Sequence, residues 1–215
     1  MTPEARVAAA IDVLDAILDG QSGEKTLTTW ARKNRYAGSK DRAAVRDLVF
    51  DALRQQKSSE YMGGAATGRG LMIGQMRLQG IDLEDIFSGQ GYGPPPLDDA
   101  EVAHSAELAG APQAVRLDCP EWLLPLLGAS LGDKTDSVLE CLRHRAAVFL
   151  RVNTAKCTVQ AAIDALAQDD IEAVPHPLSS TALDVTRNPR RVHLSQAYLT
   201  GLVELQDAAS QAVTD

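Results

Sequence analysis

Basic side chains gather in two segments, and their type and spacing suit chemistry with a polyanion. Residues 24–57 hold nine lysines and arginines against four acids. Residues 143–157 hold four cations and no acid, namely Arg143, Arg145, Arg151 and Lys156. Such groups bind phosphate, and the field that a phosphate feels is local because salt screens charges over roughly 8 Å. The net charge of −8 therefore leaves nucleic acid open as a partner.

Trp30 and Tyr36 lie within the first basic segment, close to its cations, and could stack on unpaired bases. That segment is interpreted either as a surface that follows an RNA backbone or as a solvated helix face with Trp30 in the core. We also consider Arg151 and the turn after it as an RNA contact, because an alternating strand would place Arg151 on the face opposite Leu150 and Val152. The candidate RNA-binding residues are Arg32, Lys33, Arg35, Lys40, Arg42, Arg46, Arg151 and Lys156.

Two other charged stretches are weaker candidates. Arg187, Arg190 and Arg191 form a third basic cluster in a proline-containing loop. Residues 78–115 hold seven acids and neither lysine nor arginine, and we interpret them as a solvated face.

The sequence contains no pattern of residues typical of a catalytic site or a metal site. The chain has no Walker phosphate loop and no Gly-x-Gly-x-x-Gly turn between a strand and a helix. Its four histidines are scattered without a second ligand at metal spacing. Cys119 precedes Pro120 and is read as a packing residue at a helix entry, with a nucleophile as the alternative. We predict no catalytic residue and no metal site in this chain.

The three cysteines are odd in number and unclustered, which is typical of a reducing compartment. No apolar run approaches the roughly 20 residues of a membrane span, and the N-terminus does not resemble a signal peptide. These features predict a cytoplasmic protein without a membrane partner.

The elements that must position the basic residues fall into two groups. Helical periodicity predicts helices over 3–18, 25–35, from Ser39 to about 54, one or two within 63–80, about 97–108, from Pro120, and 135–143. The glycines of 63–70 are read as loose helix packing, and the breaker run 89–96 as a loop. From residue 148 the pattern changes to strands at 148–153, 171–174, 182–185 and 202–205, with helices at 158–167 and from 207. We therefore predict a mainly α protein with an all-helical domain over 1–145 and a small α/β domain over 146–215.

Two segments resemble signatures of one family. The run from Phe149 to Lys156, FLRVNTAK, resembles the "LRVN-x-x-K" signature, and Gly201 to Gln211, GLVELQDAASQ, resembles "G-x-[FVY]-x-[VL]-Q-D-x-[AS]-S-Q". Both belong to the RsmB/Sun/NOL/NOP family of RNA cytosine-5 methyltransferases. Residues 119–124, CPEWLL, resemble the helix entry upstream of the first signature.

The first 110 or so residues are similar to the NusB-like helical domain at the front of bacterial members. Asp41 to Phe50, DRAAVRDLVF, resembles that domain's "D-R-x-x-x-x-[ED]-L-V-[YF]-G" stretch, although Asp51 and Ala52 follow in place of the usual continuation. The resemblance implies a NusB-like domain followed by a ferredoxin-like (RRM-like) α/β domain.

The resemblance also implies a function. Family members continue past the second signature into a Rossmann-like domain that binds S-adenosylmethionine and carries two cysteine motifs, and this sequence stops at Asp215. The chain is then expected to recognise ribosomal RNA for a parent enzyme, to partner the parent's own catalytic domain, and to bind no cofactor and catalyse nothing itself. By resemblance Gln206 and Asp207 lie near the cofactor side of that missing domain, whereas the residues alone suggest a helix-start cap. The alternative function is a non-catalytic module of the antitermination type that joins RNA to a protein.

Overall fold

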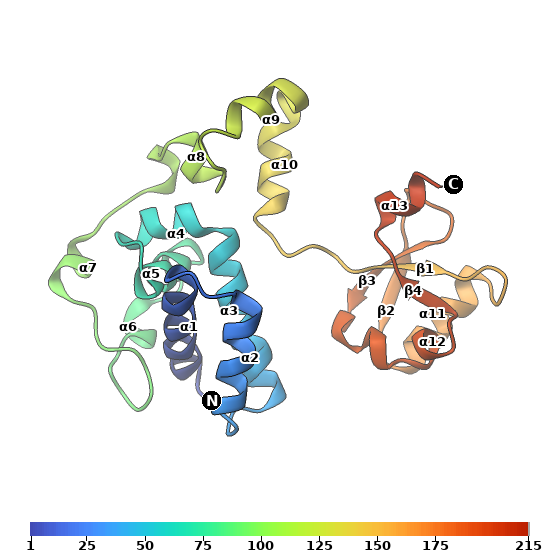
Figure 1. The fold of residues 1–215 in the computed structure, drawn as a ribbon, viewed down its shortest axis with the longest axis horizontal. Coiled ribbons are helices and arrows are strands. Elements are labelled where there is room, and N and C mark those ends of the chain that lie inside the picture. Colours follow the sequence, from blue (N-terminus) through green and yellow to red (C-terminus); the bar gives the residue numbers. More distant parts are fainter. Residues whose placement is uncertain (215) are drawn as a thin grey trace. The chain divides into compact units, whose positions relative to one another are not determined.

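The structure, a computed structural model, describes residues 1–214 and forms two compact units, Met1–Arg145 and Ala146–Asp215 (Figure 1). The first unit contains only helices among its described elements, and the second contains a four-stranded sheet. With 57% of the chain helical, the predicted order of a helical domain followed by an α/β domain is confirmed.

The helical unit is built around α1 (Pro3–Leu18), which packs against α2 (Gly23–Lys33), α3 (Ser39–Arg54) and α5 (Gly68–Leu78). Its start follows from the sequence: Thr2 accepts a hydrogen bond from the Ala5 amide at 3.3 Å, and Pro3 occupies the first turn. The core contains mainly aliphatic side chains, with Val13, Leu14, Val45, Val49, Leu71 and Ile73 among its most buried members.

The start of α3 differs from the prediction. Ser39 is already the first helical residue, and the cap is Gly38. Gly38 has no side chain to accept a bond, but its own amide donates to Oδ2 of Asp41 at 3.2 Å. Likewise α2 ends at Lys33, two residues before the predicted end.

The packing of α4 (Gln56–Gly63) on α5 is tight, so the prediction of loose packing around the glycines was wrong. A Cβ atom placed on Gly63 would lie 1.9 Å from the carbonyl oxygen of Gly70, and one on Gly74 would lie 1.9 Å from that of Ser59. Glycine is required at these positions because the two helix backbones touch directly.

The segment after α5 is mostly irregular. Short helices α6 (Leu83–Ile86) and α7 (Asp99–Ala103) lie on either side of residues 89–96, which contain neither helix nor strand. The acidic helix expected over 97–108 is restricted to α7. Helix α7 ends before His104, whose Nε2 lies 2.9 Å from the Tyr61 carbonyl oxygen. Residues 104–107 form a loop that leads to the 3₁₀ turn η1 (Leu108–Gly110).

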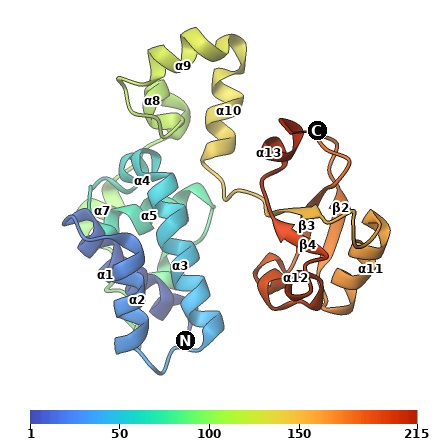
Figure 2. The same ribbon diagram turned by 45° about the vertical axis from the view of Figure 1, so that its right-hand side comes forward.

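The last part of the helical unit is an arm made of α8 (Gln113–Arg116), α9 (Leu124–Leu131), the 3₁₀ turn η2 (Gly132–Lys134) and α10 (Thr135–Leu142). Leu117, Cys119 and Leu139 form its small core. Figure 2 shows α9 across the top of the arm, α10 descending from the end of α9, and α8 beside α4. The helix predicted to start at Pro120 starts four residues later, and Cys119 is buried, as expected of a packing residue.

The second unit has the order of a ferredoxin-like fold. Its strands are β1 (Phe149–Val152), β2 (Glu172–Pro175), β3 (Ala182–Arg187) and β4 (Val203–Leu205), in the sheet order β2-β3-β1-β4 with every pair antiparallel. Helix α11 (Val159–Gln168) connects β1 to β2, and η3 (Pro189–Leu194) with α12 (Gln196–Leu199) connects β3 to β4. Leu150, Val152, Leu166, Leu183 and Val203 are buried between the sheet and these helices.

The chain closes with α13 (Ala208–Ala212), which packs on β1 and β3. Gln211 anchors this helix although it is polar and 1% exposed. Its Nε2 donates to the carbonyl oxygens of Leu150 and Gln206 at 3.2 and 3.1 Å, and its Oε1 accepts from Thr181. Over residues 1–214 no helix is long and apolar enough to cross a bilayer.

Candidate nucleic-acid interface

Five of the predicted RNA contacts form one exposed surface of the helical unit. Helix α2 ends with two of them, the connecting turn carries the third, and the first turn of α3 carries the last two. We call this set the α2–α3 cationic surface; it comprises Arg32, Lys33, Arg35, Lys40 and Arg42. None of the five side chains forms an ion pair or hydrogen bond with a residue in the described range 1–214. Their charges are therefore available to a ligand.

The acids of the same segment do not neutralise this surface, because each is engaged elsewhere. Asp41 accepts two hydrogen bonds from Arg6, at 3.0 and 2.8 Å, and lies 3.2 Å from the N-terminal amine. The Arg6 hydrogen bonds hold the pKa of Asp41 below its usual range, although burial opposes the shift. Asp51 pairs with Arg54 at 2.7 Å, and Asp47 lies 3.4 Å from Arg145.

Arg46 is a different case from the other five. Its guanidinium makes a two-pronged pair with Glu24, at 2.7 and 2.8 Å, and lies 5.8 Å from the centre of the Phe50 ring. Both partners are exposed, so the pair itself is weak, but an RNA phosphate would have to displace Glu24 before Arg46 could bind it.

In the ferredoxin-like unit, Arg151 lies on β1 and Lys156 in the turn that follows. Arg151 is exposed while Leu150 and Val152 are buried, which is the alternation the sequence predicts. It lies 3.5 Å from Glu204 on the neighbouring β4. Lys156 Nζ donates to the carbonyl oxygen of Thr200 at 2.8 Å. Both cations thus have local partners, and their charges are less available than those of the α2–α3 cationic surface.

Arg143 was counted with the second basic segment as a group available to phosphate, and for this residue the interpretation was wrong. Arg143 is partly buried, with its side chain 11% exposed, and donates from Nε to Asp118 Oδ2 at 2.8 Å. Its Nη1 also reaches Glu140 at 2.8 Å. Arg145 pairs with Asp47. Glu140 lies three residues before the segment 143–157, and Asp118 and Asp47 lie far from it in the sequence, so the tally of charge over 143–157 included none of them.

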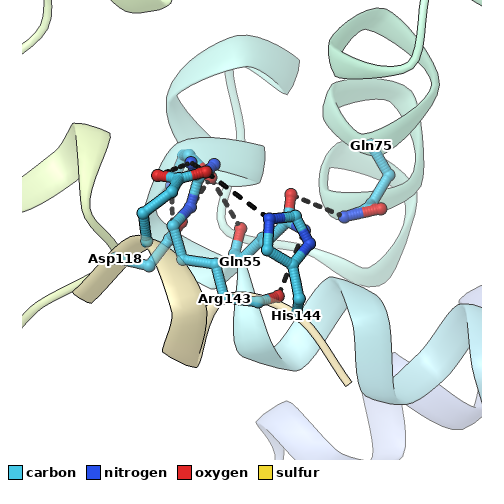
Figure 3. Close-up of polar contacts among 7 residues, drawn as sticks. Gln55, Gln75, Asp118, Arg143 and His144 are labelled. Atoms are coloured by element: carbon cyan, nitrogen blue, oxygen red, sulfur yellow. Dashed lines mark hydrogen bonds and ion pairs between the residues drawn. The ribbon is translucent and has the colours of Figure 1, made fainter. Parts of the chain in front are cut away.

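Figure 3 shows Arg143 pointing at Asp118 within a polar cluster that joins the arm to α4. Asp118 also accepts from the amide and hydroxyl of Ser58, both at 2.8 Å. Gln55 Nε2 donates to the Arg143 carbonyl oxygen at 3.3 Å and its Oε1 accepts from Gln75. Sequence reasoning missed this cluster. The one signal in the sequence was that an acid, Asp118, and a base, Arg143, stand at the two ends of the segment that forms α9 and α10.

The third basic cluster is largely neutralised by its neighbours. Arg187 pairs with Glu172 at 2.7 Å and with Asp170 at 3.2 Å. Arg191 pairs with the same Asp170 at 3.1 Å. The pKa of Arg187 is raised mainly by its hydrogen bond to Glu172. This cluster stabilises the end of the β2–β3 pair and is a poor candidate for phosphate.

The residues linked by resemblance to a cofactor have structural contacts here. Asp207 caps α13, because its Oδ1 accepts from the amides of Ala209 and Ser210 at 2.8 and 3.4 Å. The Oε1 atom of Gln206 is buried and has no hydrogen-bond partner among the described residues. Within residues 1–214 no group of three or more His, Cys, Asp or Glu side chains is placed to hold a metal ion.

Comparison with known families gives a match to the arm and the first part of the second unit. Residues 119–193 match the sequence model described as the ferredoxin-like domain of RsmF/B-like methyltransferases. The match begins at Cys119, within the arm, and so includes α9 and α10 as well as β1 to η3.

Similarity to whole proteins extends over nearly the entire chain. The chain is 25% identical over 237 aligned residues to two proteins named ribosomal RNA small subunit methyltransferase B, one from Yersinia pseudotuberculosis serotype O:1b and one from Yersinia pestis bv. Antiqua. Each alignment covers 96% of this chain and 54% of the relative. The chain thus spans about half the length of these relatives. The crystal structure of PH0851 shares the fold with a TM-score of 0.54, at 18% identity, over 98% of this chain and 54% of that one. The chain is therefore similar to about half the length of these ribosomal RNA methyltransferases, and its residues 119–193 match the ferredoxin-like domain of the RsmF/B-like type.

Proposed function

We propose that this chain is the RNA-recognition portion of an S-adenosylmethionine-dependent ribosomal RNA cytosine-5 methyltransferase, acting in the cytoplasm. The helical unit is then a NusB-like RNA-binding domain, and the ferredoxin-like unit leads into the parent's catalytic domain. The observation that carries the proposal is the α2–α3 cationic surface, whose five charges have no acidic partner in the described chain.

RNA binding depends chiefly on neutralising phosphates, which releases the counterions condensed around them. A cation already paired with a carboxylate gains little from a phosphate, because the first pair has to be broken. The α2–α3 cationic surface avoids this cost, since the acids Asp41, Asp47 and Asp51 are held by other cations. This surface would therefore provide most of the affinity, with Arg151 and Lys156 as weaker contacts.

The methyl transfer itself is proposed for the rest of the parent protein. In that chemistry a cysteine thiolate attacks the cytosine ring and S-adenosylmethionine supplies the methyl group. The residues described here would bind and orient the RNA. Asp207, as the cap of α13, and Gln206 beside it would then help to fix where the chain leaves the ferredoxin-like unit.

The test is RNA binding by a charge-neutralised surface. A labelled fragment of small-subunit ribosomal RNA is titrated with the chain at several salt concentrations, and anisotropy gives the Kd. The variant Arg35→Gln/Lys40→Gln/Arg42→Gln removes three charges from the surface. The control Lys134→Gln/Arg187→Gln/Arg191→Gln removes three exposed charges elsewhere.

We expect the surface variant to bind more weakly and its salt dependence to fall by about 2 in slope, roughly 0.7 for each lost phosphate contact. The control should keep the slope of the unmodified chain. Equal losses in the two variants would mean that only total charge matters and would contradict a specific surface. Binding that does not depend on salt would contradict the whole proposal.

A further inference from the structure

The helical unit contains a cleft of about 1050 Å³ on a side formed by α1, the end of α2, α6 and the loop that follows α6. Four carboxylates line it, Glu4 and Asp12 from α1 and Glu84 and Asp85 from α6. The described residues lining it include neither lysine nor arginine. The terminal amine of Met1, which also lines the cleft, is paired with Asp41 at 3.2 Å, so the described lining carries a net negative charge, in contrast to the cationic surface of the same unit.

Aromatic rings form the other part of the lining. Trp30 comes from α2, Tyr36 from the α2–α3 turn, and Tyr92 from the loop 89–96. Tyr36 is 74% exposed and Tyr92 is 88% exposed, which is unusual for side chains of this size. Neither ring packs into the core of the helical unit, so both are available to a ligand.

The four carboxylates have no cationic partner inside the described chain. None of them takes part in a salt bridge among residues 1–214, whereas Asp41 and Glu101, elsewhere in the helical unit, are both paired. Burial and the neighbouring charge of Asp15 together raise the pKa of Asp12. A carboxylate in this state gains from the arrival of a positive charge.

We infer that this cleft binds an arginine-containing peptide segment of a partner protein. A guanidinium is attracted both by carboxylates and by the faces of aromatic rings, and the cleft supplies both. Phosphate-bearing ligands are repelled by the four acids, so this is not a second RNA site. The volume slightly exceeds that of ordinary small-molecule pockets, which suits several adjacent side chains of an extended segment rather than one small amine.

The inference goes beyond RNA recognition and assigns a role to part of the acidic stretch 78–115, which the sequence alone suggested was only solvated. Helix α2 would serve two ligands from one end. Trp30 and Asn34 line the cleft, whereas the neighbouring Arg32, Lys33 and Arg35 do not and belong to the α2–α3 cationic surface.

The test uses Trp30 as a reporter. The chain has two tryptophans, and Trp122, at 71% exposed, can be changed to Phe to leave Trp30 alone. This Trp122→Phe chain is titrated with an acetylated and amidated Gly-Arg-Gly-Arg-Gly-Arg peptide, with the same peptide carrying citrulline in place of arginine, and with spermine. Far-UV circular dichroism checks that each variant is folded.

Matched variants separate the site from the overall charge. Asp12→Asn/Glu84→Gln/Asp85→Asn removes three charges from the cleft, and Asp99→Asn/Glu107→Gln/Asp133→Asn removes three exposed charges elsewhere. We expect the cleft variant to weaken the arginine peptide about tenfold, from three exposed charge pairs, and the control to change it less than twofold. Tyr92→Ala should weaken it about threefold through loss of a cation–π contact, and it changes only an exposed loop residue.

Three results would overturn the inference. The citrulline peptide could bind as tightly as the arginine peptide, which would remove the charge argument. The two triple variants could weaken binding equally, which would leave only general attraction to an acidic protein. Spermine could bind as tightly as the peptide, which would make this a polyamine site.

Discussion

The Nε atom of Arg143 donates a hydrogen bond to Oδ2 of Asp118 across 2.8 Å, and the two side chains are 11% and 3% exposed. The pair connects the end of α10 to the turn before α9, and Asp118 reaches on to Ser58 of α4 (Figure 3). Among the described residues of the helical unit it is the most buried ion pair between two side chains, and it fixes the arm to the helices beneath.

Removing the charge of Asp118 is expected to destabilise the helical unit by about 3 kcal/mol, because Arg143 would stay buried with only the more exposed Glu140 as a partner. Asn is the right replacement, since Asp118 has a φ of +50°, a conformation that Asn tolerates. Urea denaturation of Asp118→Asn against the unmodified chain measures the effect. The double variant Asp118→Asn/Arg143→Met should recover part of the loss, and a free energy of unfolding unchanged in the single variant would contradict the role given to the pair.

Replacing Gly74 by Ala should cost about 3 kcal/mol, since the new methyl group would lie 1.9 Å from the Ser59 carbonyl oxygen and would push α4 away from α5. Gly128 in α9 is the matched control. A Cβ there meets no atom within 4 Å, so the same substitution should stabilise the chain by about 0.5–1 kcal/mol. Thermal unfolding of both variants gives the two signs, and a loss of stability in Gly128→Ala together with tolerance in Gly74→Ala would contradict this packing.

These two sites show where sequence reasoning succeeds and where it stops. Helical and strand periods correctly indicated α1, α10, α11 and all four strands, because each period reflects which face of one element is buried. The glycines of α4 and α5 were misread because sequence composition does not reveal which backbones touch. Arg143 was misread for the same reason, since Asp118 and Ser58 lie 25 and 85 residues away along the chain.

The candidate interface was predictable for a related physical reason. Arg32, Lys33, Arg35, Lys40 and Arg42 are exposed and close in sequence, so their clustering needed only the local helix–turn–helix arrangement. Whether each acid in the segment was already occupied depended on distant cations such as Arg6 and Arg145. The acidic cleft combines α1, α2 and α6, and no local pattern indicates it.

Stability should fall in acid through the paired carboxylates, of which Glu101 is the clearest. Arg69 donates to it at 2.7 and 2.8 Å, and these hydrogen bonds hold the pKa of Glu101 below its ordinary 4.5 despite some burial. A folded-state pKa below the unfolded value means that the unfolded chain binds more protons, so this contribution is present above about pH 4.5 and is lost as pH falls through the lowered pKa.

Glu101→Gln tests this, because Gln can still serve in the capping box of α7 while the charge is lost. The difference in free energy of unfolding between the unmodified chain and Glu101→Gln should be largest near pH 7 and should shrink below pH 4.5. Urea titrations at pH 7, 5, 4 and 3 measure it. Asp99→Asn, an exposed acid without a basic partner in the described chain, serves as the control, and a difference that widens towards acid would contradict the assignment.

The state of Arg46 gives the sharpest test of the RNA surface. Because Glu24 holds its guanidinium in two hydrogen bonds, Arg46→Gln should change RNA affinity less than twofold, whereas Arg42→Gln, which removes an unpaired charge, should weaken it about threefold. Glu24→Gln should then act in the opposite direction and strengthen binding about threefold, since it frees a cation beside the α2–α3 cationic surface. The salt slope of Glu24→Gln should steepen by about 0.7, the value for one further phosphate contact.

Anisotropy titrations of the three variants against one ribosomal RNA fragment measure these changes in affinity and slope. If Arg46→Gln weakened binding as much as Arg42→Gln while Glu24→Gln left it unchanged, RNA would already displace Glu24 in the complex, and the order of importance drawn from these ion pairs would be wrong.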